Sequence, residues 1–169
     1  MIITDIDSFL AYYAKVKART TRLFEYIPAD KIEWTYQAGK FTIGDIIRHN
    51  ALIERNMYAE NVQLKPSKYQ GCGPEYASGL EAVVQFYQAQ HQESLAIFSK
   101  LSAADLQRKC PTPGGIQITT WKWLRAMVEH EIHHRGQLYT YLGMLEVKTP
   151  PIYGLTSEQV IENSQKGVI

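Results

Sequence analysis

The sequence is poor in cysteine, has no long apolar run and carries no excess charge of either sign. Its two cysteines, Cys72 and Cys110, lack the paired spacing of a zinc site or a redox motif. A chain of 169 residues can bury roughly two thirds of its unfolded surface without disulfides. A reducing cytoplasm is therefore the simplest compartment for this protein, and neither cysteine is expected to be catalytic.

The missing apolar run and the balanced charge exclude further classes of protein. No stretch approaches about 18 consecutive apolar residues, so we expect no membrane span. The first ten residues, MIITDIDSFL, contain two acidic residues and no basic one, so we expect no signal peptide. The 18 Lys and Arg against 17 Asp and Glu provide no basic face for nucleic acid. We predict one soluble cytoplasmic domain over residues 1–169, with neither a nucleic-acid nor a membrane partner.

Four segments show the apolar spacing of amphipathic helices, each preceded by a helix-capping signal. The predicted helices span about residues 5–26, 43–63, 79–100 and 120–144. The capping residues, including one for a short C-terminal helix, are Thr4, Thr42, Ser78, Thr119 and Thr156. Helices of this length with one apolar stripe each bury those stripes best as a four-helix bundle.

The three connections between these helices are longer than the usual two to eight residues in bundles. They cover about residues 27–41, 64–78 and 101–118 and are rich in Pro and Gly. Such lengths permit a crossover, so the spacing leaves the order of the helices open. The predicted fold is all-α: a four-helix bundle with long connecting loops and a short C-terminal helix.

Two histidines share one face of the last long helix. His130 and His134 are four residues apart, about 6 Å along the axis, and lie on the stripe that also holds Met127 and Leu138. Imidazoles at this spacing can bind one metal ion together. His133 is rotated by about 100° and is expected near the rim or in solvent.

A third histidine points inward from a second helix. His49 lies on the apolar stripe of the segment 43–63, so three imidazoles from two helices form a plausible metal site with room for water or substrate. The alternative is a set of hydrogen-bonded core histidines. His91, on the stripe of the segment 79–100, is more typical of a hydrogen-bonded core or rim histidine than of a residue lining the site.

Several other side chains near these histidines have competing interpretations. Asp45 either orients His49 or caps a helix with Thr42, and we favour the cap. Glu129 and Glu131 are expected to face solvent. Aromatic residues of the last helix either line a pocket or pack in the core, which we favour: Trp121, Trp123 and Tyr141.

Two segments resemble a known family. VEHEIHHRGQLYTYL, residues 128–142, is similar to the signature of the DinB-like superfamily, DNA-damage-inducible four-helix bundles with metal sites. FTIGDIIRHNALIERNMYAE, residues 41–60, resembles the segment that carries this family's first histidine. The resemblance covers essentially the whole chain. It implies a metal triad of His49, His130 and His134, an up-down-down-up bundle, frequent homodimers and a role in the stress response.

The resemblance also implies an activity, because related members include bacterial thiol transferases that use bacillithiol, mycothiol or glutathione. The leading hypothesis is a metal-dependent thiol S-transferase, in which zinc, nickel or iron activates a low-molecular-weight thiol for attack on a small electrophile. Arg135 would hold a carboxylate of the thiol, unless it forms a surface salt bridge, and His91 is a second candidate contact. The alternatives are a metal-dependent hydrolase and a non-catalytic metal or small-molecule binding protein. No further catalytic residue is predicted.

Overall fold

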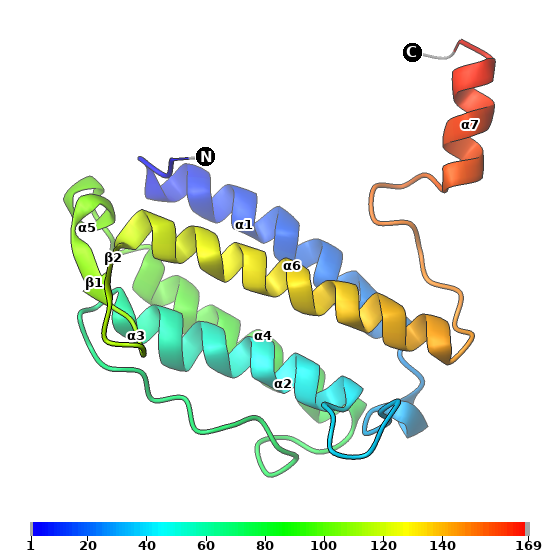
Figure 1. Ribbon diagram of the computed structural model, residues 1–169, viewed down its shortest axis with the longest axis horizontal. Helices are drawn as coiled ribbons and strands as arrows, with labels where there is room; N and C mark the ends of the chain where they lie inside the picture. Colours follow the sequence, from blue (N-terminus) through cyan, green and yellow to red (C-terminus); the bar gives the residue numbers. More distant parts are fainter. Residues whose placement is uncertain (1, 168–169) are drawn as a thin grey trace.

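The computed structural model describes residues 2–167 and consists mainly of four long helices packed as a bundle (Figure 1). These helices are α1 (Ile6–Thr21), α2 (Ile43–Ile53), α4 (Leu80–Phe98) and α6 (Thr120–Met144). Short segments extend or join them: the 3-10 helices η1 (Arg22–Tyr26) and η2 (Ala29–Lys31), the π-helical η3 (Glu54–Tyr58), and α3 (Ala59–Asn61). The four helices predicted from apolar spacing are confirmed, as is the all-α bundle.

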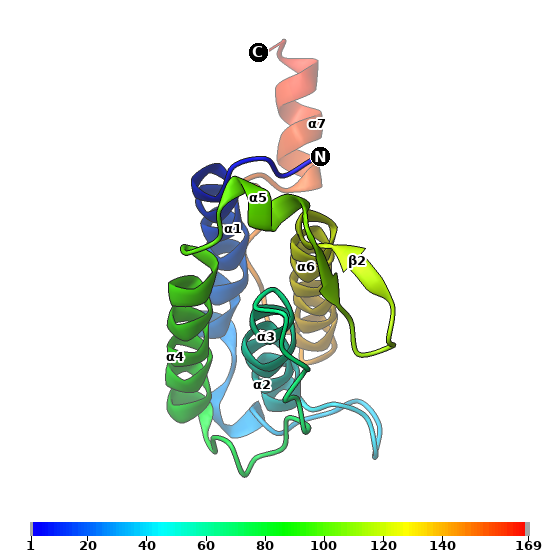
Figure 2. The ribbon, with the colours of Figure 1, turned by 90° about the vertical axis from the view of Figure 1, so that its left-hand side faces the viewer.

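The order of the helices is up-down-down-up. α1 and α6 run in one direction, whereas α2 and α4 both run in the other (Figure 1). The two parallel helices follow one another because the connection 62–79 returns along the length of the bundle before α4 begins. Viewed from its end in Figure 2, the bundle has α2 packed between α4 and α6, while α1 packs against α6. The crossover that long connections permit is therefore present.

The core has two apolar clusters, one toward each end of the bundle. Met127 and Val128 of α6 belong to the first cluster, and Leu138 and Leu142 to the second. Each fully buried Leu, Ile or Phe contributes about 1.5–3 kcal/mol to folding. Between these anchors, α6 presents mostly polar residues to the interior, and both polar clusters described below include residues from this segment.

Two of the predicted helix caps form as expected. The Thr42 hydroxyl accepts a hydrogen bond from the Asp45 amide, and the Asp45 carboxylate accepts one from the Thr42 amide. Thr156 and Gln159 form the same reciprocal pair at the start of α7 (Ser157–Gln165). These pairs satisfy backbone donors that the helix itself leaves unpaired.

Three of the predicted caps differ in the structure. The cap of α1 is Asp5 rather than Thr4, and its carboxylate accepts a hydrogen bond from the Ser8 amide at 2.7 Å. α4 starts after Gly79, whose φ of +83° favours glycine, and no side chain caps it. Thr119 stands at the N-cap of α6 without a side-chain capping bond.

The connection 101–118 contains structure that the sequence reading did not predict. A short helix, α5 (Ala103–Gln107), precedes an antiparallel pair of strands, β1 (Lys109–Pro111) and β2 (Gln117–Thr119). Cys110 lies opposite Ile118 in this pair. Elements of three to five residues are too short to show a periodic apolar pattern, so apolar spacing could not predict them.

The C-terminal segment leaves the bundle after α6. α7 stands apart from the four long helices, and none of its residues is buried (Figure 1). The Arg22 guanidinium holds the start of this segment by donating to the carbonyls of Pro151 and Ile152 at 2.8 and 3.1 Å. No helix within residues 2–167 combines the length and the apolar character needed to cross a membrane.

Candidate functional site

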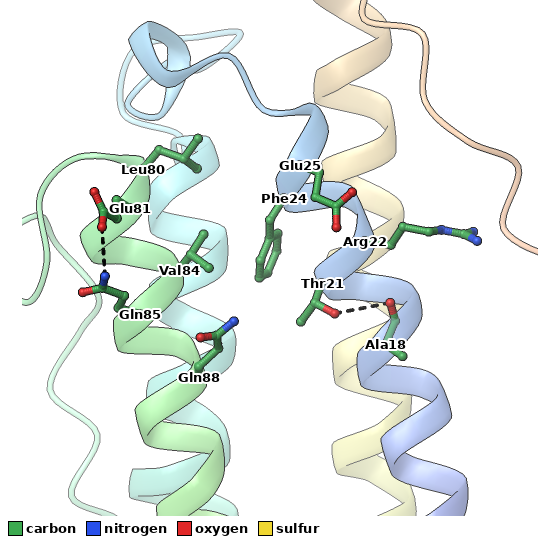
Figure 3. A pocket seen from close by; sticks show the side chains of 10 residues that line it. All are labelled: Ala18, Thr21, Arg22, Phe24, Glu25, Leu80, Glu81, Val84, Gln85 and Gln88. Carbon is green, nitrogen blue, oxygen red and sulfur yellow. Dashed lines mark hydrogen bonds between the residues drawn. The ribbon is translucent and has the colours of Figure 1, made fainter.

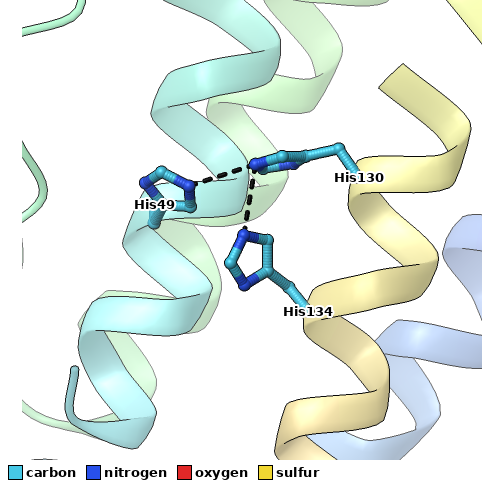
Figure 4. Close-up of side chains that lie close together, drawn as sticks. All are labelled: His49, His130 and His134. Atoms are coloured by element: carbon cyan, nitrogen blue, oxygen red, sulfur yellow. Dashed lines mark hydrogen bonds between the residues drawn. The ribbon is translucent and has the colours of Figure 1, made fainter. Parts of the chain in front are cut away.

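The three histidines singled out in the sequence lie together between α2 and α6, with His134 buried and the other two half-buried (Figure 4). His49 comes from α2, and His130 and His134 come from successive turns of α6. Nε2 of His130 is 3.1 Å from Nε2 of His49 and 3.1 Å from Nε2 of His134. One nitrogen from each ring lies within 4.8 Å of the other two. The packing of α2 against α6 thus converts two helical stripes into one cluster.

The outer nitrogens of two of these rings have hydrogen-bonding partners. Nδ1 of His134 lies 2.6 Å from Oε1 of Gln137, and Nδ1 of His49 lies 2.8 Å from the Tyr69 hydroxyl. A carbonyl oxygen only accepts, so Nδ1 of His134 carries the proton and its Nε2 directs a lone pair into the cluster. The Tyr69 oxygen can accept from His49 in the same way. Such partners orient metal-binding imidazoles.

Sequence reasoning missed both of these partners. Gln137 lies three residues after His134 on the same helix, so its spacing could have identified it. Tyr69 lies in the connection 62–79 and is brought to His49 only by the path of that loop. Asp45, the partner considered for His49, instead caps α2 and accepts from Nη2 of Arg48 at 2.7 Å. The favoured structural interpretation of Asp45 is therefore confirmed.

The environment of the cluster keeps its imidazoles neutral. Burial and the nearby His134 lower the pKa of His49 to about 4. Burial, followed by the neighbouring histidines, lowers the pKa of His130 to about 3. Burial also lowers the pKa of His134, against the opposing effect of its hydrogen bond to Gln137. At neutral pH all three side chains are uncharged, which is the form that binds metal.

The geometry of the cluster fits a divalent metal ion. Two nitrogens bound to one ion at 2.0–2.1 Å with tetrahedral angles lie about 3.3 Å apart. The separations of 3.1 Å at His130 are close to this value. One N–H group cannot satisfy several converging lone pairs, whereas a cation can accept all of them. Imidazole suits zinc, nickel and iron alike, so the donor set does not choose among these metals.

A cavity of about 400 Å³ opens beside this cluster. α6 contributes His134, Gln137 and Tyr141 to its wall, and the segment 36–41 of the first connection contributes the remainder. The Phe41 ring from this segment lies 5.3 Å from the His49 ring, measured between centroids. The histidine cluster therefore has a neighbouring space large enough for a small organic molecule. Tyr141, which we assigned to the core, is largely buried and also lines this cavity.

The other candidate residues lie elsewhere. Nδ1 of His91 is 2.7 Å from Oε1 of Glu54, so this histidine is a hydrogen-bonded residue outside the cluster. Arg135 is 4% exposed and donates from Nη1 to the Val16 carbonyl of α1 at 3.2 Å. Its position gives no support to a contact with a bound thiol, nor to a surface salt bridge. His133 is exposed, as expected from its rotation around α6.

A second buried polar group lies in the bundle, and we refer to Lys17, Glu54 and Glu131 as the charged cluster. Nζ of Lys17 is 2.9 Å from Oε2 of Glu54 and 3.4 Å from Oε2 of Glu131. The hydroxyls of Tyr13 and Tyr87 donate to Glu54 and Glu131 at 2.8 and 2.7 Å. Burial alone would raise the pKa of Glu54, but Lys17 and His91 outweigh it and hold that pKa at about 2.

The expectation that Glu131 faces solvent is wrong. Its side chain is 3% exposed and points toward α1 and α4 rather than outward. α6 packs against both α1 and α2, so it buries two faces, one with the histidines and one with Glu131. A single apolar stripe in the sequence does not reveal the second face. Glu129 is exposed, as expected.

A larger cavity, of about 480 Å³, lies between the C-terminal end of α1 and the start of α4 (Figure 3). Phe24, Leu80 and Val84 form its apolar part, and Gln85 and Glu81 at its edge are hydrogen-bonded to each other. Among residues 2–167, the only group of three potential metal ligands is the histidine cluster, and none of its members lines this cavity. Size alone therefore does not identify the functional site.

The comparison with protein families decides which family this chain belongs to. A model of the DinB superfamily matches residues 12–138, a span that includes all three clustered histidines. The chain belongs to the DinB superfamily. Both segments that resemble this superfamily, residues 41–60 and most of 128–142, lie inside the match. A comparison with curated protein sequences finds no match.

Solved structures of DinB-like proteins share the fold of this superfamily member. A DinB-like protein from Bacillus cereus is 17% identical, covers 89% of this chain and 99% of its own, and gives a TM-score of 0.74. A DinB-like protein from Bacillus subtilis is 19% identical, covers 86% of this chain and 96% of its own, and gives a TM-score of 0.69. A mycothiol-dependent maleylpyruvate isomerase is 12% identical, covers 79% of this chain and 60% of its own, and gives a TM-score of 0.60.

Proposed function

We propose that this DinB superfamily member is a thiol S-transferase that depends on a divalent metal ion held by His49, His130 and His134. The observation that carries this proposal is the convergence of three neutral imidazoles beside an open cavity. The likeness of the fold to a mycothiol-dependent isomerase supports an enzyme that works with a thiol. The proposed reaction joins a low-molecular-weight thiol to a small electrophile.

The chemistry divides between the ion and the protein. A bound zinc, nickel or iron ion would supply the positive charge that favours the thiolate form of the thiol. Gln137 and the Tyr69 hydroxyl hold the imidazoles of His134 and His49 in place, and the neighbouring cavity holds the electrophile close. The reaction forms a carbon–sulfur bond and the thiol proton passes to solvent. Where the electrophile carries a leaving group, that group departs with its electron pair.

The thiol is supplied by a separate molecule rather than by the protein itself. Cys72 and Cys110 are both buried, and burial raises the pKa of each thiol. Both are therefore poor nucleophiles. A hydrolase would need a general base beside the open position, and no Asp or Glu from the described residues lines the cavity next to His134. The lack of such a base supports thiol transfer over hydrolysis as the proposed activity.

We further infer a cytoplasmic homodimer with a role in the stress response, as the resemblance to the superfamily implies. The formal net charge of only +1 accords with small-molecule partners rather than nucleic acid. Light scattering of the purified protein would measure its mass in solution. A mass of twice 19.3 kDa is expected, and a monomer at micromolar concentration would contradict the dimer.

The experiment that tests the activity begins with protein purified without a histidine tag or chelator. Elemental analysis measures the bound metal, and monochlorobimane is then offered with bacillithiol, mycothiol, glutathione or cysteine. We expect thiol-dependent conjugation that chelation abolishes and added metal restores. Equal rates with and without metal would contradict the proposal. Hydrolysis without thiol would indicate the hydrolase, and tight ligand binding without turnover would indicate a binding protein.

A further inference from the structure

One wall of the cavity beside His134 is the loop segment 36–41, which is held against α6. The Tyr141 hydroxyl donates to the Phe41 carbonyl at 3.0 Å. The Tyr141 ring also meets the rings of Trp34 and Tyr36, with centroids 5.6 and 5.7 Å apart. Gly39 has a φ of +78°, so the chain reverses there and brings Lys40 to the cavity. The aromatic contacts give this space a defined shape.

Lys40 is exposed, and among the described residues that line the cavity it is the only one with a formal charge. Within residues 2–167 its ammonium forms no ion pair. The acidic residues nearest to Lys40 in the sequence, Glu33 and Asp45, are both bound to Arg48 at 2.7 Å. Among the side chains that line the cavity, Lys40 therefore carries a positive charge that no acidic side chain compensates.

The remaining lining favours a flat molecule. Tyr36, Phe41 and Tyr141 line the space, and aromatic rings pack well against planar, conjugated groups. A ligand with a carboxylate could pair that group with Lys40 while its conjugated body lies among the rings. Such a ligand would extend from Lys40 toward the histidine cluster.

We propose that this cavity binds a planar, conjugated carboxylate, with Lys40 as the residue that selects its negative charge. This proposal rests on the proposed function, in which the ligand is the electrophile. For an α,β-unsaturated carboxylate, the thiolate sulfur forms a bond to the β carbon and the electrons of the double bond move to the α carbon. That carbon takes a proton from solvent, so thiol and alkene combine into one product.

A binding experiment tests Lys40 without any turnover. Full-length, isotope-labelled protein, as purified and after chelation, is titrated with cinnamate and with its uncharged amide by two-dimensional NMR. We expect cinnamate to shift the Gly39 and Phe41 amide signals and to bind about fivefold more tightly than the amide, in both forms. Lys40→Gln should abolish the preference and Lys40→Arg should keep it.

A matched lysine provides the control for this titration. Lys100 is also exposed and unpaired among the described residues, and it follows α4, outside the cavity. Lys100→Gln should bind both probes like the unmodified protein. Equal affinity of Lys40→Gln and the unmodified protein for cinnamate would overturn the proposal, as would an equal loss in Lys100→Gln.

Turnover separates this proposal from the proposed function. If no thiol is transferred but cinnamate binding still depends on Lys40, the transferase is wrong and the cavity proposal stands. If transfer is equally fast with charged and uncharged electrophiles and in Lys40→Gln, the transferase stands and the cavity proposal fails. An effect of Lys40→Gln with glutathione but not with 2-mercaptoethanol would assign the bound carboxylate to the thiol, which overturns the proposed role for the electrophile.

Discussion

The bundle contains two polar clusters, one buried and one half-buried, that both include residues of α6. They differ in how their polar groups are paired. In the charged cluster, Lys17 lies between two carboxylates, and tyrosine hydroxyls occupy further acceptor positions. In the histidine cluster, the inner nitrogens meet only one another, and a cavity opens beside them. Lys17 supplies the cation for the charged cluster. In the histidine cluster, nitrogen lone pairs converge on a position that an external cation could occupy. The candidate functional site is therefore identified by converging nitrogen lone pairs that lack a partner, rather than by the burial of polar groups.

The largest expected effect is loss of metal from the histidine cluster. His134→Ala should abolish metal binding, because two imidazoles form a weaker chelate and leave another position to water. His49→Ala should behave alike, despite lying 81 residues from His130. Elemental analysis of protein purified without chelator measures the occupancy.

The neighbouring histidine provides the control for this substitution. His133→Ala should keep its metal, since this exposed side chain points away from the cluster. Circular dichroism must show that each variant is folded. A folded His134→Ala protein that retains metal, beside a folded His133→Ala protein that loses it, would refute the assignment of the ligands.

The second prediction breaks the charged cluster instead. Lys17→Met leaves Glu54 and Glu131 buried without their cation and should lower the free energy of unfolding by about 3–5 kcal/mol. Urea unfolding followed by circular dichroism measures this change. Lys15→Met, at an exposed position of the same helix, should change it by less than about 0.5 kcal/mol. A loss below about 1 kcal/mol for Lys17→Met would show that the cluster does not depend on its lysine.

The third prediction distinguishes the clusters by pH, in metal-free protein. The pKa values of His49 and His130 fall to about 4 and about 3 on folding, so below pH 6.5 the unfolded chain binds protons that the folded chain does not. Stability therefore decreases as the pH falls from 6.5 toward 4. The Glu54 pKa falls from 4.5 to about 2 on folding, so its contribution is present above pH 4.5 and is lost between 4.5 and 2.

Urea unfolding at a series of pH values tests these two windows. Each excess proton bound by the unfolded state lowers stability by about 1.4 kcal/mol per pH unit. His49→Gln should reduce the slope of the free energy of unfolding against pH between pH 6.5 and 4. It should leave the slope below pH 4 unchanged. A stability that is constant between pH 6.5 and 5 in the unmodified, metal-free protein would contradict the neutral state of these imidazoles.

The smallest expected effect concerns the partner of His49. Tyr69→Phe removes the hydroxyl that holds Nδ1 of His49 and should weaken metal binding about tenfold with little change in stability. Competition with a chromogenic chelator measures the affinity. Tyr76→Phe, a change in the same connection at a residue outside the cluster, is the matched control. Equal affinity of the two variants would show that Tyr69 does not orient the imidazole.

Much of the fold was predictable from local sequence because the helices depend on spacing within short segments. The apolar periodicity predicted a helix over about residues 120–144, where α6 lies, and the i,i+4 spacing placed His130 and His134 on one face. The position of His49 on its own stripe was sufficient to point it inward. The Thr42 cap was readable for the same reason, since its partner lies three residues away.

Only the tertiary structure decided which distant groups meet. Glu131 is buried because Lys17, 114 residues earlier, reaches it from α1, and no local pattern contains that pairing. The hydrogen bond between Tyr69 and His49 and the cavity that Phe41 lines arise from the paths of two loops over the bundle. The sequence alone thus determined the helices and the direction of the three histidines, since both follow from the 3.6-residue repeat. Packing of the helices and loops decided the partners, the charge balance and the access of the site, since these depend on contacts between segments far apart in the chain.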